Sequence, residues 1–235
     1  MPDASLPGGQ PVQVAPGPAG LQGVLFDMDG LLVDTEPLWF EVESIVMARL
    51  GGDWDPADQQ HLIGGSLARS VDYLLGKATR PASRETVARW MVGGMVELLD
   101  SRPVPVLPGA RRLLAEVAAA GMPHALVTSS ERVVMEAVLR QLRVTFPVTV
   151  TGDDVAATKP DPEPYLLAAA RLDADPRRCA AIEDSPNGVA SAEAAGCLTV
   201  AVPSLVPIPP RPGRLVLASL AELSLDGLRQ LAAGR

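Results

Sequence analysis

The chain has 235 residues, of which 47% are apolar and 20% are charged, and acidic residues outnumber basic ones by 28 to 20. This composition is that of an ordinary globular protein and excludes a largely disordered one. No apolar run approaches the roughly 18 residues of a membrane helix, so we expect no membrane association. The net charge of −8 repels phosphate backbones and argues against nucleic acid as a partner.

Two features predict the cellular setting. Residues 1–20 are rich in proline and glycine and lack the apolar stretch of an export signal, so we expect a flexible tail there. The two cysteines, Cys179 and Cys197, form no C-x-x-C pair and are too few for a disulfide framework. We therefore expect a cytoplasmic protein in a reducing compartment, present as a monomer or a weak homodimer.

Short apolar runs that end abruptly predict the strands of a sheet. The first run, Gly23–Phe26, is followed directly by Asp27-Met28-Asp29-Gly30. The other expected strands are residues 125–128, 148–150, 180–182 and 198–202, with a last short one near 215–217. Helical periodicity fills the stretches 110–120, 131–142, 162–172 and 186–195, and a further helix ends the chain. This alternation predicts an α/β fold with a Rossmann-like, doubly wound parallel sheet covered on both faces.

One segment interrupts the alternation. From about Thr35 to Val106 only helical periodicity is present, over residues 35–50, 67–75 and 84–99. A helical block inserted after the first strand predicts a second, smaller domain. We therefore expect an α/β core domain made of residues 21–34 and 107–235, and an α-helical cap domain made of residues 35–106.

Acidic and hydroxyl-bearing residues follow several predicted strands, where ligands of open parallel sheets bind. They are Asp27, Asp29, Thr128, Ser129, Asp153, Asp154, Glu183 and Asp184, with Lys159 shortly after the third strand. Two carboxylates a few ångströms apart repel each other by on the order of 4 kcal/mol at an effective dielectric constant of ~20, so such a rim needs protons or cations. Lys159 supplies one positive charge, and Mg²⁺, which binds carboxylates and substrate phosphate, supplies more.

The spacing of Asp27 and Asp29 favours phosphoryl transfer. Residues two apart on a strand face the same side, so both carboxylates can approach one substrate. One can attack phosphorus to give an aspartyl-phosphate, and the other can protonate the leaving alkoxide and then activate water. Thr128 and Ser129 can donate hydrogen bonds to the phosphoryl oxygens, and Lys159 can neutralise the charge that builds there. Each motif alone is more often structural, but their succession at strand ends favours the functional interpretation.

Four motifs resemble those of the haloacid dehalogenase superfamily, in the branch with a helical cap inserted after the first motif. They are residues 26–35, 127–130, 159–160 and 182–185, and the resemblance covers roughly residues 21–202. It implies that Asp27 is the nucleophile and Asp29 the general acid/base. It also implies that Thr128 binds phosphate and that Lys159 stabilises the nucleophile and the phosphoryl group.

The resemblance further implies a Mg²⁺ site. Asp184 would be a ligand, together with Asp27 and the backbone carbonyl of Asp29. Glu183 would be a second acidic ligand or a hydrogen-bond partner of a metal-bound water. The second aspartate of the first motif, at position 29, favours phosphoryl chemistry over dehalogenation.

The cap sequence helps to choose between branches of the superfamily. Residues 34–39, Asp-Thr-Glu-Pro-Leu-Trp, are similar to bacterial sugar-phosphate phosphatases of the 2-deoxyglucose-6-phosphatase type. The neighbouring β-phosphoglucomutases carry a histidine in place of Trp39 and a phosphate-binding arginine near Leu67. Without that second phosphate clamp the chain is expected to hydrolyse, although Arg69 is close enough to leave a mutase open.

Residues 61–66 resemble the cap loop that enters the active site of this family, and with it we expect Gly64, Gly65 and Trp39 to bind substrate. The function predicted from the sequence is a Mg²⁺-dependent phosphatase that acts on small phosphorylated metabolites, in particular sugar or polyol phosphates. The alternatives are a β-phosphoglucomutase-like mutase and a non-catalytic metabolite-binding protein.

Overall fold

The computed structural model describes residues 20–234, so nearly all of the predicted tail lies outside the described residues. Six strands form one sheet: β1 (Gly23–Phe26), β2 (His124–Val127), β3 (Val148–Val150), β4 (Cys179–Glu183), β5 (Leu198–Ala201) and β6 (Arg214–Val216). Their order is β3-β2-β1-β4-β5-β6, and every neighbouring pair is parallel. The predicted α/β fold with a parallel sheet is confirmed, with small differences at the strand ends.

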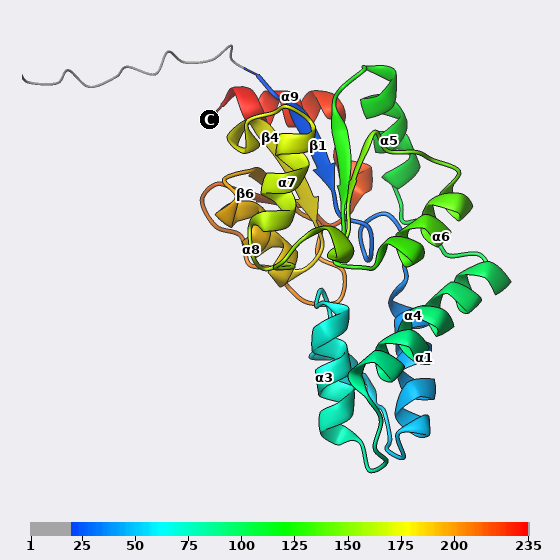
Figure 1. The fold of residues 1–235 in the computed structure, drawn as a ribbon. Helices are drawn as coiled ribbons and strands as arrows, with labels where there is room; N and C mark the ends of the chain where they lie inside the picture. Colours follow the sequence, from blue (N-terminus) through cyan, green and yellow to red (C-terminus); the bar gives the residue numbers. More distant parts are fainter. Residues whose placement is uncertain (1–19, 235) are drawn as a thin grey trace, which may run out of the picture.

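Helices cover both faces of this sheet (Figure 1). The helices α5 (Ala110–Ala119), α6 (Arg132–Leu142) and α9 (Leu225–Ala233) pack on one face, and α7 (Glu163–Arg171) and α8 (Pro186–Ala194) pack on the other. The alternation along β1 shows why, because Val24 and Phe26 contribute to the first apolar cluster and Leu25 to the second. A strand buried on both faces needs a continuous apolar sequence, and this is the pattern from which β1 was predicted.

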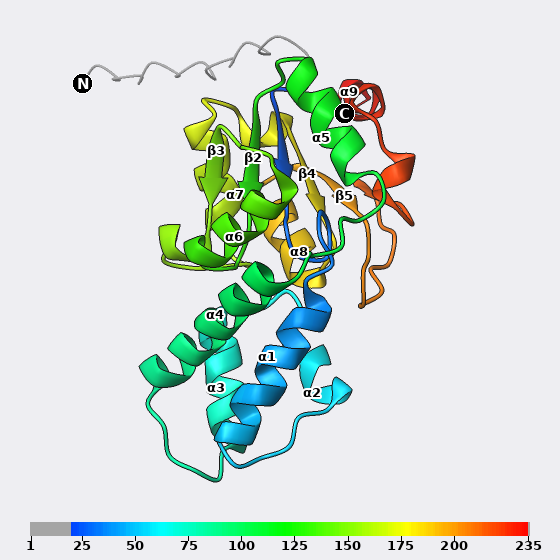
Figure 2. The same ribbon diagram turned by 90° about the vertical axis from the view of Figure 1, so that its right-hand side faces the viewer.

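The segment between β1 and α5 is helical. It contains α1 (Glu36–Arg49), α2 (Pro56–Gln60), α3 (Leu67–Lys77) and α4 (Arg84–Ser101). Figures 1 and 2 show these helices as a block beyond the carboxyl ends of the strands. The short helix α2 was not predicted, because one turn is too short to show periodicity. It begins at a capping aspartate, Asp55, which accepts hydrogen bonds from the backbone N–H groups of Ala57 and Asp58 at 2.8 and 3.0 Å.

The two connections between the helical block and the rest of the molecule run side by side. Val33 forms an antiparallel bridge with Val106, and Asp34 N donates to Pro105 O at 2.9 Å. Gln141 of α6 braces the returning connection by accepting a hydrogen bond from Val104 N at 2.7 Å. Within residues 20–234, no helix is long and apolar enough to cross a membrane.

Candidate active site

The register of the sheet places Asp27 at the centre of its carboxyl edge. Phe26, the last residue of β1, lies opposite Leu126 of β2 and Ile182 of β4. Asp27 N still continues this pairing, since it donates to Ile182 O at 3.1 Å. The residues level with Asp27 are therefore Val127 at the end of β2 and Glu183 at the end of β4.

A buried lysine joins these neighbouring strands. Lys159 Nζ donates to Asp27 Oδ1 at 2.5 Å, to Glu183 Oε1 at 2.6 Å and to Val127 O at 2.8 Å. Burial alone would lower the pKa of Lys159, but the charges of Asp27 and Glu183 outweigh it and raise that pKa above its ordinary value. The ammonium group therefore stays charged, and its three protons are all engaged.

Glu183 is the most deeply buried member of this group. Its side chain is fully buried and accepts a second hydrogen bond from the Tyr165 hydroxyl, at 2.5 Å. The carboxylate lies directly over Gly188 of α8, where a Cβ atom would come within 1.9 Å of it. Glu183 therefore faces Lys159 and Tyr165, and it does not line the cleft described below.

Three hydroxyl groups hold the side chain of Asp29. Thr35 Oγ1 and Ser130 Oγ donate to it at 2.5 and 2.8 Å, and Thr128 Oγ1 donates at 3.2 Å. Thr35 lies just before α1, whereas Thr128 and Ser130 follow β2. The half-buried carboxyl of Asp29 is thus fixed in orientation beside Asp27.

Three buried carboxylates come together at this edge. Asp27, Glu183 and Asp184 each offer an oxygen, and these atoms lie within 4.8 Å of one another. Burial, followed by the charges of Asp27 and Glu183, raises the pKa of Asp184 well above its ordinary value. Burial likewise raises the pKa of Asp27, against the opposing charge of Lys159. A compact set of oxygen donors that is costly to ionise without a counter-charge suits a hard divalent cation.

Asp184 is held from both sides. Ser204 Oγ, in the proline-rich loop after β5, donates to Asp184 Oδ2 at 2.5 Å. On the other side lies Gly30, where a Cβ atom would come within 2.1 Å of that same oxygen and where φ is +74°. Only glycine fits this position without strain, so the turn after Asp29 is shaped around the carboxylate.

A cleft of about 720 Å³, open solvent included, lies between this edge and the helical block. Among the predicted site residues, those that line it are Asp27, Asp29, Trp39, Gly64, Gly65, Thr128, Ser129, Lys159 and Asp184. Ser129 Oγ is buried there without a hydrogen-bond partner. Glu183 is the predicted site residue that the structure places behind the cleft rather than on its wall.

The loop at residues 61–66 lies between the cleft and the core, and its residues 62–66 line the cleft. Gly64 has φ +64°, and a Cβ atom there would come within 2.6 Å of Ser185. The carbonyl of Gly64 accepts a hydrogen bond from Asn187 Nδ2 at 3.1 Å. The helical block therefore touches the same loop that carries Asp184.

Two acidic residues expected at this edge, Asp153 and Asp154, do not line the cleft. Asp154 forms ion pairs with Arg132 and Arg171 at 2.5 and 3.2 Å, and Asp153 accepts a hydrogen bond from Arg132 N at 2.6 Å. They connect the end of β3 to α6 and α7, so their role is structural.

The mutase alternative depended on Arg69. This exposed arginine donates to the carbonyl of His61 and does not line the cleft. Leu67, near which the resemblance places the phosphate-binding arginine of the mutases, does line it.

Several site residues escaped the sequence analysis. Tyr165 and Ser204 give no local signal, because only the tertiary structure brings them to Glu183 and Asp184. On the cap side, the cleft is also lined by Glu36, Glu43 and Gln59. Two of these were accessible from the sequence, since Glu36, Trp39 and Glu43 follow at the three- and four-residue spacing of one helix face.

The fold and this edge define the class of protein, a Rossmann-like α/β protein with paired aspartates and a lysine at the sheet edge and a helical insert after β1. A family model described as haloacid dehalogenase-like hydrolase matches residues 24–202, and the chain belongs to this family. It is similar to hexitol phosphatase B of Escherichia coli K12, with 33% identity over 92% of this chain and 96% of that protein. It is also similar to phosphoglycolate phosphatase of Yersinia pestis, with 31% identity over 75% and 78%. By class it is thus a phosphoric monoester hydrolase.

Two solved structures share the fold of this chain. CbbY from Rhodobacter sphaeroides, as a variant in complex with xylulose-(1,5)bisphosphate, superposes with a TM-score of 0.82 at 30% identity, over 89% of this chain and 99% of that one. A β-phosphoglucomutase from Clostridium difficile superposes with a TM-score of 0.80 over 91% and 98%, but at 23% identity it supports the fold alone.

Proposed function

We propose that this protein is a Mg²⁺-dependent phosphatase that hydrolyses sugar or polyol phosphates through an aspartyl-phosphate on Asp27. The observation that carries the proposal is the arrangement at the sheet edge. Asp27 is bonded to a charged, buried Lys159, and Asp29 is held beside it by three hydroxyl groups, with both open to one cleft.

The roles follow from where each group lies. An Oδ atom of Asp27 attacks phosphorus, and the bond from phosphorus to the ester oxygen breaks. The leaving alkoxide takes the proton of Asp29, which in the second half-reaction removes a proton from the attacking water. That water breaks the bond between Asp27 and phosphorus, which releases inorganic phosphate and restores both aspartates.

The phosphoryl oxygens would be received by the loop after β2. Thr128 would turn its hydroxyl from Asp29 to the phosphoryl group, and Ser129 offers a backbone N–H together with a hydroxyl that has no other partner. Lys159 holds the attacking carboxylate in place and balances the negative charge that develops at phosphorus.

The metal site proposed here uses Asp27, Asp184 and the backbone carbonyl of Asp29. The clustered carboxylates suit Mg²⁺ chemically, and the ion, when bound, would neutralise phosphate charge. Glu183 is the deepest of the acidic residues and would act as a further ligand or through a metal-bound water. Its bonds to Lys159 and Tyr165 favour the second role.

Substrate class and organisation are also proposals. The names of the relatives point to small phosphorylated carbohydrates, and the position of Arg69 outside the cleft favours hydrolysis over mutase chemistry. We infer a core domain of residues 21–34 and 107–235 and a cap domain of residues 35–106, divided at the paired connections near Asp34 and Val106. A cytoplasmic monomer or weak homodimer fits the composition of the chain.

The test is phosphate release from a panel of phosphorylated sugars and polyols, with p-nitrophenyl phosphate as a general probe, in the presence of Mg²⁺. We expect turnover that EDTA abolishes and that added Mg²⁺ restores. Following β-glucose 1-phosphate by phosphorus NMR separates the alternatives, because a mutase gives the 6-phosphate and a phosphatase gives inorganic phosphate. Absence of phosphate release from every compound would overturn the proposal.

A further inference from the structure

The cap side of the cleft holds a carboxyl group that lacks a partner. Glu43, in the second turn of α1, is only 3% exposed, and it lines the same cleft as Asp27. Its Oε2 atom is buried and has no hydrogen-bond partner among the described residues. Leaving a buried polar group unsatisfied costs about 1–3 kcal/mol, so a group of this kind points to a ligand that completes it.

The neighbouring polar groups of the cap are already paired. Gln59 Nε2 donates to the carbonyl of Glu36 at 2.9 Å and to its carboxylate at 3.2 Å. The buried Trp54 indole lies next to Glu43 and lowers the pKa of its carboxyl, but Nε1 is outside normal hydrogen-bond geometry, and Trp54 does not line the cleft. Glu43 is therefore the group on this wall that a substrate could satisfy directly.

Its protonation state suits a hydroxyl group. Burial, followed by the charge of Glu36, raises the pKa of Glu43 to about 8, with a smaller opposing effect of the Trp54 indole. At neutral pH the carboxyl carries its proton and offers both an O–H donor and an acceptor oxygen. A sugar or polyol hydroxyl, which also both donates and accepts, is the matching group.

Within residues 20–234, the walls of the cleft offer no free cation to a second phosphate. Lys159 is the one cationic side chain that lines it within residues 20–234, and its three protons are engaged at the catalytic edge. The cap wall instead carries Glu36 and Glu43, and Glu131 lies at the end of the β2 loop. A phosphate or carboxylate at the far end of a substrate would therefore be buried there without a cation to balance its charge.

We propose that Glu43 binds a hydroxyl group at the end of the substrate remote from the reacting phosphate, and that the substrates are monophosphates whose other end is uncharged and hydroxylated. This inference rests on the proposed phosphatase function. It separates the chain from a relative such as CbbY, whose solved complex holds a bisphosphate.

Two pairs of compounds test it. Sorbitol 6-phosphate and n-hexyl phosphate have the same chain length but differ in hydroxyl groups, and fructose 6-phosphate and fructose 1,6-bisphosphate differ by one phosphate. We expect the wild-type kcat/KM to favour the first member of each pair. The Glu43→Leu variant should lose about tenfold in kcat/KM on sorbitol 6-phosphate, the value of one lost hydrogen bond, and less than twofold on n-hexyl phosphate.

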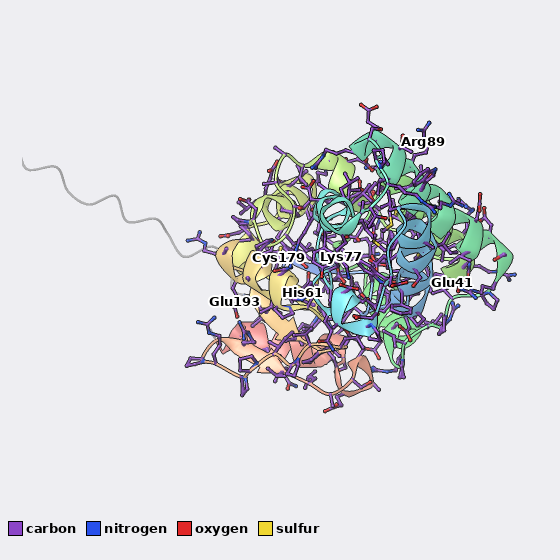
Figure 3. The ribbon with its side chains drawn as sticks, turned by 90° about the horizontal axis from the view of Figure 1, so that it is seen from below. Glu41, His61, Lys77, Arg89, Cys179 and Glu193 are labelled. Carbon is purple, nitrogen blue, oxygen red and sulfur yellow. The ribbon has the colours of Figure 1, made fainter. Side chains whose placement is uncertain are left out.

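Conservative and matched variants exclude a merely structural effect. Glu43→Gln keeps a donor and an acceptor and should stay within about threefold of wild type on sorbitol 6-phosphate. Glu41 lies on the same helix but at the outer edge of the molecule (Figure 3), where it pairs with Arg102. Glu41→Gln should therefore leave kcat/KM unchanged on both substrates.

The outcomes separate this inference from the proposed function. An equal loss on both monophosphates in Glu43→Leu, or an unchanged preference for the hydroxylated one, overturns the role of Glu43. Faster hydrolysis of the bisphosphate than of fructose 6-phosphate overturns the substrate class. If the wild type releases phosphate from none of these compounds and not from p-nitrophenyl phosphate either, the phosphatase proposal itself fails.

Discussion

The core wall and the cap wall of the cleft differ in how many of their polar groups already have hydrogen-bond partners. On the core wall, Lys159 uses all its protons and Asp29 receives three hydroxyl groups. On the cap wall, Glu43 is buried without a partner for Oε2. The paired groups of the core wall position the reacting atoms in advance and leave Ser129 Oγ open for the phosphoryl group, whereas the cap wall has an open carboxyl oxygen for the other end of the substrate. Variants on the two walls should therefore fail in different ways.

The largest effect is expected on the core wall, at the nucleophile. Asp27→Asn keeps the size of the side chain and an acceptor oxygen for Lys159, but it removes the attacking carboxylate. We expect kcat on p-nitrophenyl phosphate to fall by roughly 10⁴-fold or more, while the protein still folds. Thermal unfolding of the variant serves as the control, and wild-type turnover would show that Asp27 is not the nucleophile.

The next largest effect is expected at Lys159, whose ammonium group joins the ends of β1, β2 and β4. Lys159→Ala should lower kcat by roughly 10²–10³-fold, as expected for the loss of one preformed electrostatic stabiliser. The change also leaves two buried carboxylates without their counter-ion, so the unfolding free energy should fall by about 3–5 kcal/mol. Lys77→Ala, in the helical block (Figure 3), is the matched control and should leave kcat unchanged. A loss below twofold for Lys159→Ala would contradict its assigned role.

A smaller effect is expected at Ser204, which supports a residue of the core wall without lining the cleft itself. Ser204→Ala removes the hydrogen bond to Asp184 Oδ2, so the carboxylate is less well oriented for the metal. We expect Mg²⁺ affinity to weaken by roughly tenfold, with kcat restored at saturating Mg²⁺. Ser101→Ala, whose hydroxyl donates to Leu98 O in α4, is the control. An unchanged Mg²⁺ dependence of both activity and melting temperature would remove Ser204 from the site.

On the cap wall, the raised pKa of Glu43 should be detected most clearly in the pH dependence of the unfolding free energy. The pKa of Glu43 is raised to about 8 in the folded protein, against an ordinary value of 4.5. Between these values the native state holds a proton that the unfolded chain has lost, so this group lowers the unfolding free energy as pH rises, by at most about 1.4 kcal/mol per pH unit.

Replacement of that carboxyl by an amide should remove this dependence. The stability advantage of Glu43→Gln over the wild type should grow from pH 5 to pH 8 and then level off, as measured by urea unfolding at each pH. Glu41→Gln provides the baseline, since its carboxylate is part of an exposed ion pair. An advantage that is constant with pH would mean that Glu43 is ionised throughout, and the contrast between the two walls would disappear.

Much of the core wall could be predicted from the sequence, because it depends on local patterns. A buried parallel strand has a continuous apolar sequence, and its end is marked where Phe26 gives way to Asp27. Since parallel strands end at one edge, the residues after β1, β2 and β4 had to lie close together. The same reasoning was wrong for Asp153 and Asp154, because a strand end says nothing about which arginines lie nearby, and here Arg132 and Arg171 engage Asp154.

The sequence by itself determined the order of strands and helices, the insertion of the helical block and the acidic residues that meet at the sheet edge, since each is encoded in periodicity or in spacing along a few residues. Only the tertiary structure decided that Glu183 faces inward to Lys159 and Tyr165, that Ser204 supports Asp184, and that Glu43 is buried without a partner. Burial and hydrogen bonding between distant segments depend on how helices pack against the sheet and against each other, and no local pattern carries that information.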